Sequence, residues 1–83
     1  MDDDITRCIT DLLQEKGRIP VADVGSYNYV DSGHIDSLGL IKFFIRLEEK
    51  FDVDITPADI ANRDIRTVAG LAALIERKLG RQP

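Results

Sequence analysis

Apolar side chains recur every three or four residues along most of this chain, which is the period of an amphipathic helix. The pattern predicts three long helices, over about residues 3–16, 36–51 and 67–79. Gly17 and Gly80 follow the first and the last of them, and a glycine just past the final turn is a common helix stop. Each helix has an apolar face that must be buried, so the three require a shared core.

A fourth, short helix is expected between the second and third long ones. Thr56 can cap its beginning, Pro57 suits the first helical position, and Asp59 lies near the positive end of the helix dipole. This helix should end near Asn62.

The connection between the first two long helices, residues 17–35, is long and irregular. Gly17, Pro20, Gly25 and Gly33 interrupt any regular element there. Its apolar residues can nevertheless pack onto a core: Ile19, Val21, Val24, Tyr27, Tyr29 and Val30. A structureless stretch of this length is uncommon in a compact domain and is often functional. We therefore expect an all-α fold, a small helical bundle of three main helices plus one short helix, with a long loop between the first and second helices.

The second long helix carries more apolar surface than a core requires. Its core face is expected to hold Leu40, Phe43, Phe44, Leu47 and Phe51. A separate apolar stripe of Leu38, Ile41 and Ile45 lies away from the centre of that face. For any single residue of the stripe, packing under a neighbouring loop is an adequate explanation. As a set, however, the stripe and its polar neighbours are predicted to contact a partner: Leu38, Ile41, Lys42, Ile45 and Arg46.

Size and charge narrow the classes of function. The 83 residues suit one domain over 1–83, with 81–83 as a frayed tail. So short a chain has a thin core, which favours a carrier or binding module over a self-sufficient enzyme. The net charge is −4, from 15 acidic and 11 basic residues, and the basic ones are scattered. We therefore expect no nucleic-acid partner, since binding phosphates requires clustered Lys and Arg.

The compartment and the metal content follow from what the sequence lacks. No apolar run approaches the roughly 20 residues that span a bilayer, and residues 2–4 are acidic where a signal peptide would be basic. Cys8 is the only cysteine, so no internal disulfide can form. We expect a cytoplasmic protein without stable membrane insertion. We also expect no metal site, because there is no Cys/His cluster and the stretch after Asp52 lacks the glycine and the terminal glutamate of a calcium-binding loop.

The candidate chemistry lies where the long loop meets the second long helix, in residues 33–38, GHIDSL. A helix N-terminus offers unpaired N–H groups and a positive dipole end, so a phosphate ester on Ser37 would be well tolerated. The simpler alternative is that Asp36 or Ser37 is an ordinary helix cap. His34, the single histidine, is expected to be a solvated loop residue. Its near-adjacency to Asp36 and Ser37 makes a catalytic triad implausible.

The GHIDSL segment resembles the attachment-site motif of acyl carrier proteins, in which the serine after the aspartate carries 4′-phosphopantetheine. The resemblance continues in residues 47–51 (LEEKF), 55–59 (ITPAD) and 67–68 (TV), and so covers essentially the whole chain. It implies that a phosphopantetheinyl transferase moves the arm from coenzyme A to Ser37. Asp36 would support this step, by orienting the hydroxyl or holding a metal ion in the transferase. The domain itself would catalyse nothing.

The resemblance also implies what the arm does. Its thiol would hold an acyl group as a thioester, attached by an acyl-loading ligase or transferase and used by condensing or acyl-transfer enzymes. The pathway would be fatty-acid, lipid or specialised acyl biosynthesis, and a monomer is the natural form for such a shuttle. Aliphatic cargo is expected to fold into the core, against Phe43, Phe44, Leu47, Phe51, Ile60 and Leu71.

Two features depart from the commonest fatty-acid carriers. The second long helix has Lys42 and Arg46 where many of those carriers have acids, and two residues instead of one separate Gly33 from Asp36. The spacing between Gly33 and Asp36 resembles that of D-alanyl carriers and stand-alone specialised carriers. We therefore expect a carrier dedicated to one specialised pathway rather than to bulk fatty-acid synthesis. The alternatives are an aminoacyl or D-alanyl carrier protein and an unmodified helical interaction module. In such a module Ser37 would only cap the helix, and Ser37→Ala would cost about 1 kcal/mol.

Overall fold

The computed structural model describes residues 3–80 and forms a small all-α bundle. Its elements are α1 (Asp3–Gln14), the short 3₁₀ turn η1 (Val24–Ser26), α2 (Ser37–Phe51), α3 (Pro57–Ala61), the 3₁₀ turn η2 (Arg63–Arg66) and α4 (Val68–Lys78). No strand forms within the described residues, where the pairing of Asn28 with Thr67 is an isolated bridge. The fold class is therefore confirmed. The expected frayed tail, 81–83, lies outside the described residues.

The helix boundaries agree with the predicted ones to within one or two residues. α1 ends at Gln14 instead of residue 16, and Thr67 is the N-cap of α4 instead of its first residue. Gly80 adopts a φ of 79° directly after the C-cap of α4, as a helix-stopping glycine does. The two 3₁₀ turns were not anticipated, because turns of three or four residues are too short to show an apolar period.

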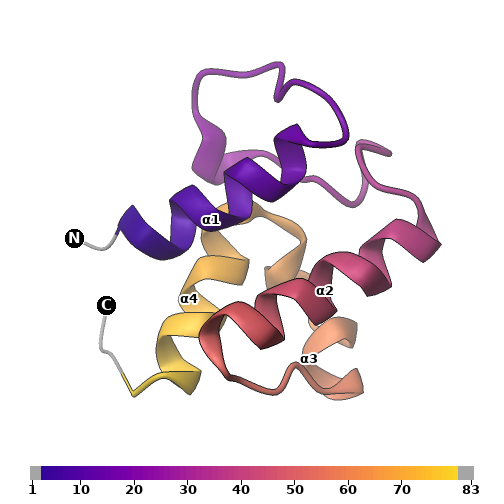
Figure 1. Ribbon diagram of the computed structural model, residues 1–83. Coiled ribbons are helices and arrows are strands. Elements are labelled where there is room, and N and C mark those ends of the chain that lie inside the picture. The colour runs from indigo at the N-terminus through magenta and orange to yellow at the C-terminus, as the bar shows by residue number, and fades with distance from the viewer. Residues whose placement is uncertain (1–2, 81–83) are drawn as a thin grey trace.

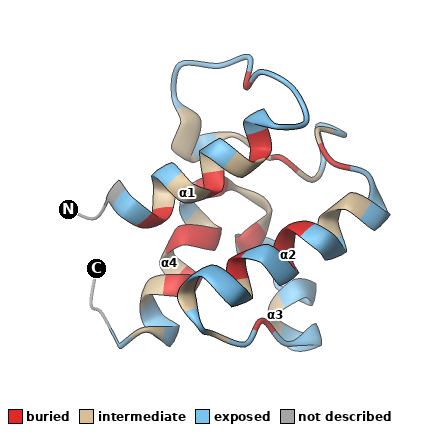
Figure 2. Cartoon of the chain, viewed as in Figure 1, coloured by how far each residue is buried: buried red, intermediate tan, exposed pale blue. Residues whose placement is uncertain are grey.

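The core lies where α1, α2 and α4 face one another. α1 packs against α4, and the long loop arches over the end of α1 before it descends to the start of α2 (Figure 1). The buried positions of all three helices point inward, whereas the outside of α2 is largely exposed (Figure 2). The buried apolar residues form one cluster: Ile5, Ile9, Leu13, Ile19, Tyr29, Ile35, Phe43, Phe44, Leu47, Ile55, Ile65, Val68, Leu71, Ala72, Leu74 and Ile75.

Two segments far apart in sequence form a clasp, which we define as the contacts of residues 27–31 with residues 65–68. The N–H of Tyr29 donates to the carbonyl of Arg66 at 3.1 Å, and the N–H of Val68 donates to the carbonyl of Tyr27 at 3.2 Å. The fully buried Tyr29 also donates its hydroxyl to the carbonyl of Ile65. The clasp holds the long loop against the beginning of α4.

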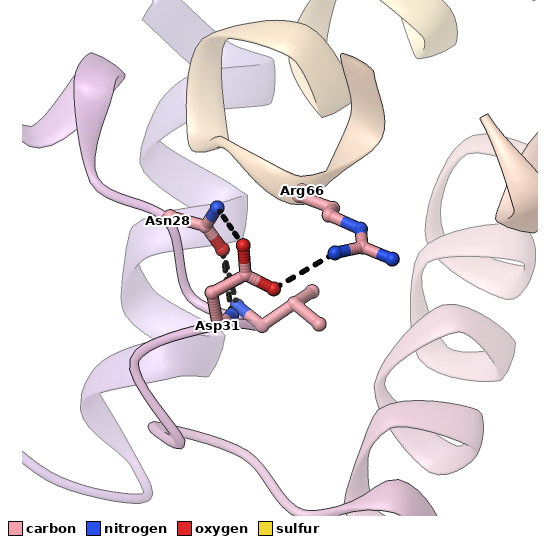
Figure 3. Close-up of polar contacts among 4 residues, drawn as sticks. Asn28, Asp31 and Arg66 are labelled. Atoms are coloured by element: carbon pink, nitrogen blue, oxygen red, sulfur yellow. Dashed lines mark hydrogen bonds and ion pairs between the residues drawn. The ribbon is translucent and has the colours of Figure 1, made fainter. Parts of the chain in front are cut away.

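A set of polar side chains reinforces the clasp at the surface (Figure 3). The guanidinium of Arg66 donates to one carboxylate oxygen of Asp31 at 2.9 Å, and the amide of Asn28 donates to the other at 3.0 Å. The side-chain oxygen of Asn28 accepts from the N–H groups of Val30 and Asp31, which shapes the turn. The loop that leads to residues 33–38 is thereby fixed at its midpoint.

Gly70 allows η2 to lie directly on the first turn of α4. A Cβ at this position would overlap the carbonyl oxygen of Asp64. Gly70 has no positive φ, so the backbone conformation does not require glycine. Glycine is required here because two backbone segments approach each other too closely to leave room for a Cβ.

Candidate functional site

Ser37 is the first residue of α2, and its side chain is exposed to solvent. The preceding residue, Asp36, is the N-cap, and its carboxylate accepts the N–H of Gly39 at 2.7 Å. Within residues 3–80 no hydrogen bond engages the Ser37 hydroxyl. Of the two caps that the sequence allowed, Asp36 or Ser37, the structure assigns the role to Asp36.

The surroundings of Ser37 fit a covalently attached phosphate. The first intrahelical bond of α2 is donated by Leu40 to the carbonyl of Asp36 at 2.8 Å, so the N–H groups of Ser37 and Leu38 precede the helical ladder. These N–H groups and the positive end of the helix dipole favour a phosphate at this position, whereas the neighbouring Asp36 carboxylate opposes it. An exposed, unengaged hydroxyl here can carry a long group into solvent without unfolding any part of the bundle.

His34 is not a solvated loop residue, which corrects the expectation from the sequence. Its Nε2 lies 2.8 Å from the carbonyl oxygen of Leu13, and its Nδ1 lies 2.9 Å from the hydroxyl of Tyr27. A carbonyl oxygen can only accept, so Nε2 carries the proton, and Nδ1 accepts from Tyr27 in the neutral ring. The rings of His34 and Tyr27 also meet edge to face, with centroids 5.4 Å apart.

His34 therefore anchors the loop to the end of α1, three residues before Ser37. Both ring nitrogens are occupied by groups of the scaffold, so His34 cannot serve Ser37 as a general base. The sequence offered no local signal for this role, because the partner carbonyl belongs to Leu13, 21 residues earlier. The structure thus supports a positioned serine without the machinery of a serine hydrolase.

The residues predicted to contact a partner all lie on the surface of α2, next to Ser37. We call Leu38, Ile41, Lys42, Ile45 and Arg46 the α2 outer face. Leu38, Ile41 and Ile45 are exposed by 64%, 58% and 46%, which is high for large aliphatic side chains. Lys42 and Arg46 are exposed as well. The simpler explanation of the stripe, that its residues pack under a neighbouring loop, therefore does not hold for any of the three aliphatic side chains.

One member of the α2 outer face is partly engaged within the chain. Arg46 donates to both carboxylate oxygens of Glu15, at 2.6 and 3.2 Å, and this pair ties α2 to the turn after α1. The hydrogen bond from Arg46 holds the pKa of Glu15 below its usual range. Both side chains are about half exposed, so the pair contributes little to stability. Lys42 makes no ion pair within the described part of the chain.

Most residues predicted to line the path of an acyl chain belong to the core. Phe43, Phe44, Leu47 and Leu71 are buried, and Phe51 is half-buried. Ile60 differs, because it is 41% exposed on the surface of the short helix α3. Its predicted place in the interior is therefore wrong: a helix of five residues turns only part of its surface inward. A groove of about 140 Å³ beside Gly39 reaches Phe43 from outside.

No helix formed by residues 3–80 is both long enough and apolar enough to cross a membrane. The same residues contain no group of three or more potential metal ligands.

The chain is an all-α bundle with an exposed serine at the beginning of α2, and within the described residues the hydroxyl of this serine makes no hydrogen bond. This is the architecture of a carrier domain. The comparison with protein families agrees: the family described as "Phosphopantetheine attachment site" matches residues 5–81, and the chain belongs to this family. The prosthetic group of the family is a covalently attached 4′-phosphopantetheine, and its domains are non-catalytic carriers that a transferase modifies. No individual curated protein is similar enough to the chain to serve as a relative.

Proposed function

We propose that this chain is an acyl carrier protein whose 4′-phosphopantetheine arm is attached to Ser37. The observation that carries the proposal is the division of tasks at the start of α2. Asp36 caps the helix, so the adjacent Ser37 hydroxyl is exposed and free to react. The α2 N-terminus then supplies N–H groups and a positive dipole end for the phosphate of the product.

The modification requires a transferase and coenzyme A. The Ser37 oxygen would form a bond to the phosphorus next to the pantetheine, the pyrophosphate bond would break, and adenosine bisphosphate would leave. The hydroxyl proton would pass to a base of the transferase, since His34 is committed to Leu13 and Tyr27. The exposed carboxylate of Asp36 would support the step from the carrier side. When attached, the arm supplies a thiol that holds acyl groups as thioesters.

The bundle would supply docking and shelter. The α2 outer face would contact the partner enzymes: the transferase, an acyl-loading ligase or transferase, and condensing or acyl-transfer enzymes. Aliphatic cargo would reach the core beside Phe43, against Phe44, Leu47 and Leu71, with Phe51 at its edge. We propose that one domain over residues 1–83 acts as a monomeric, cytoplasmic shuttle in fatty-acid, lipid or specialised acyl biosynthesis.

An aminoacyl or D-alanyl carrier is the second candidate. It is favoured by the two residues between Gly33 and Asp36. Cargo chemistry separates the two candidates. The phosphopantetheinylated chain would be offered to an acyl-activating and to an aminoacyl-activating ligase, and the mass of the thioester formed would decide between them.

Intact-mass spectrometry tests the attachment site directly. The chain and its Ser37→Ala variant would be incubated with coenzyme A and a broad-specificity phosphopantetheinyl transferase. We expect the wild-type chain to gain the mass of one phosphopantetheine and the variant to gain none. A Ser26→Ala variant is the matched control, because Ser26 is an exposed serine of the loop that leads to α2, and it should be modified normally. Modification of Ser37→Ala, or none of the wild-type chain beside a reactive control carrier, would contradict the proposal.

A further inference from the structure

A larger groove lies next to the one beside Gly39, between the same two helices. The two grooves have volumes of about 140 and about 380 Å³, and Leu12 of α1 and Arg46 of α2 line both of them. α1 and α2 run in opposite directions (Figure 1), and α1 packs more closely on α4 than on α2, which leaves room between α1 and α2. We call the groove beside Gly39 the near groove, the larger one the far groove, and the two together the α1–α2 seam.

The Arg46–Glu15 ion pair lies at the boundary between the two grooves. Arg46 lines both grooves, Glu15 lines the near one, and the guanidinium donates to both carboxylate oxygens, at 2.6 and 3.2 Å. The side chains of Arg46 and Glu15 are 54% and 51% exposed, so water screens the pair and its opening costs little. With the pair open, the near and far grooves would join beside Leu12.

The less exposed residues of the seam are apolar, although its rim is charged. Ile35 and Phe43 of the near groove are buried, and Cys8 and Leu12 of the far groove are half-buried. Burial raises the pKa of the Cys8 thiol, so at neutral pH the group is uncharged and acts as a small apolar side chain. The rim of the far groove carries charges of both signs: Asp4, Arg7, Asp11, Arg46 and Lys50. Because these charges oppose each other, the far groove favours an uncharged aliphatic occupant over an ion of either sign.

The near groove begins two residues after Ser37, at Gly39, and has room for only a short chain. At roughly 30 Å³ per group, the share of one water molecule in the liquid, the near groove holds about five groups and the far groove about twelve. Inward of Phe43, Leu47 and Leu71 are fully buried in the core, where close packing leaves little free space. A longer chain therefore extends more easily along the seam, where the far groove is already open.

We propose that an aliphatic cargo carried by the Ser37 arm lies in the α1–α2 seam, and that the Arg46–Glu15 pair determines which chain lengths occupy the far groove. This inference rests on the proposed function. The flexible arm would fold back along α2 to bring its end to Gly39. Chains of up to about five carbons would stay in the near groove with the pair closed. Longer chains would displace the pair and cover Leu12 and Cys8, because burial of a few methylene groups outweighs one exposed ion pair.

Alkylation of Cys8 tests the inference, because Cys8 is the only cysteine of the chain and lines the far groove. A transferase that accepts them would attach the arm from butyl, octyl or dodecyl thioethers of coenzyme A, which cap the arm thiol and cannot pass their chain to Cys8. Each loaded chain would be treated with iodoacetamide, and its rate compared with that of the unmodified chain. We expect the butyl-loaded chain to react at the unmodified rate. The dodecyl-loaded chain should react about tenfold more slowly, since alkylation then requires the cargo to leave the far groove.

A variant of the ion pair tests its role as a length limit. Glu15→Ala removes the pair, so an octyl cargo should protect Cys8 about two- to fivefold more strongly in the variant than in the wild-type chain, each relative to its own unmodified form. Glu49→Ala is the matched control, because Glu49 is an exposed acid of α2 that lines neither groove, and it should leave the protection unchanged.

Two results would overturn the inference while intact mass still showed an arm on Ser37. Equal alkylation rates for the unmodified chain and all three loaded chains would place the cargo outside the seam. Equal protection by butyl and dodecyl cargo, or no effect of Glu15→Ala, would show that the pair sets no length limit. A wild-type chain that takes no arm from coenzyme A would contradict the proposed function itself.

Discussion

Asp36 and Ser37 are adjacent, but the helix uses only one of them for its own stability. The Asp36 carboxylate receives the Gly39 N–H at 2.7 Å, whereas the Ser37 hydroxyl contributes no hydrogen bond within the described residues. A cap and a reactive group are thus separated by one peptide unit. Modification of Ser37 therefore need not cost the helix its cap.

Substitutions at the two positions should differ in their effect on the free energy of unfolding. We expect Asp36→Ala to lower it by about 1 kcal/mol, because the Gly39 N–H loses its acceptor. Ser37→Ala should change it by less than about 0.5 kcal/mol, as for an exposed substitution that removes no contact. Urea denaturation followed by circular dichroism measures both. An equal loss in the two variants would mean that Ser37 shares the capping role.

At the scale of the elements, α3 is too short to be stable alone and is held by its ends. Thr56 and Asp59 form a capping box, with their side chains bonded to each other's N–H groups at 2.9 and 3.2 Å. Asp59 also pairs with Lys78 of α4 at 2.7 Å, where both side chains are only 21–24% exposed. The hydrogen bonds from Lys78 and Thr56 keep the pKa of Asp59 below its usual range.

This depressed pKa makes the α3–α4 contact sensitive to acid. An aspartate whose pKa is lower when folded stabilises the protein above its unfolded pKa of about 3.9, and this contribution is lost as the pH falls through the folded value. At pH 6 we expect Lys78→Met to reduce stability more than Arg77→Met does, by roughly 1 kcal/mol or less. Arg77 is the matched control, since it makes no ion pair within residues 3–80. Urea titrations should show the difference shrinking toward pH 3, and a constant difference would contradict the assignment.

At the scale of the whole molecule, the clasp and the His34 contacts fix the long loop between α1 and α2 at two places. His34 joins it to the end of α1, and Tyr29 joins it to the segment before α4. The loop can then deliver Asp36 and Ser37 to a defined place, although it contains no regular element longer than η1. Burial raises the pKa of Tyr29, so its hydroxyl stays protonated and remains a donor at every physiological pH.

Removal of the Tyr29 hydroxyl should destabilise the whole bundle. Tyr29→Phe keeps the ring packed on Phe43, whose centroid is 5.5 Å away, but leaves the buried Ile65 carbonyl without its donor. We expect a loss of about 1–3 kcal/mol. Arg66→Gln, which breaks the exposed pair with Asp31, should cost less than about 1 kcal/mol. Thermal and urea unfolding of both variants would check the order, and a larger loss for Arg66→Gln would show that the surface pair carries the clasp.

The sequence by itself determined the features that depend on near neighbours. The helical period of the apolar residues predicted the three long helices, and Thr56 and Pro57 predicted the start of the short one, as the structure confirms. Gly80 marked the end of α4, which the structure also confirms. The same period separated the exposed stripe of Leu38, Ile41 and Ile45 from the core face of α2, because the angle between side chains on one helix follows from their spacing alone. The GHIDSL segment pointed to the family that residues 5–81 match.

The tertiary structure alone decided the features that depend on partners distant in the chain. It placed His34 between Tyr27 and Leu13, left Ile60 exposed, and brought Asp64 so close to Gly70 that only glycine fits. It also chose Asp36 over Ser37 as the cap, a choice between neighbours that the preferences of the two side chains leave open. Each of these outcomes depends on how elements dock after they form. The spacing of residues in the sequence describes the faces of one helix at a time. How the helices and loops pack against each other depends on side chains and carbonyl groups from several elements at once.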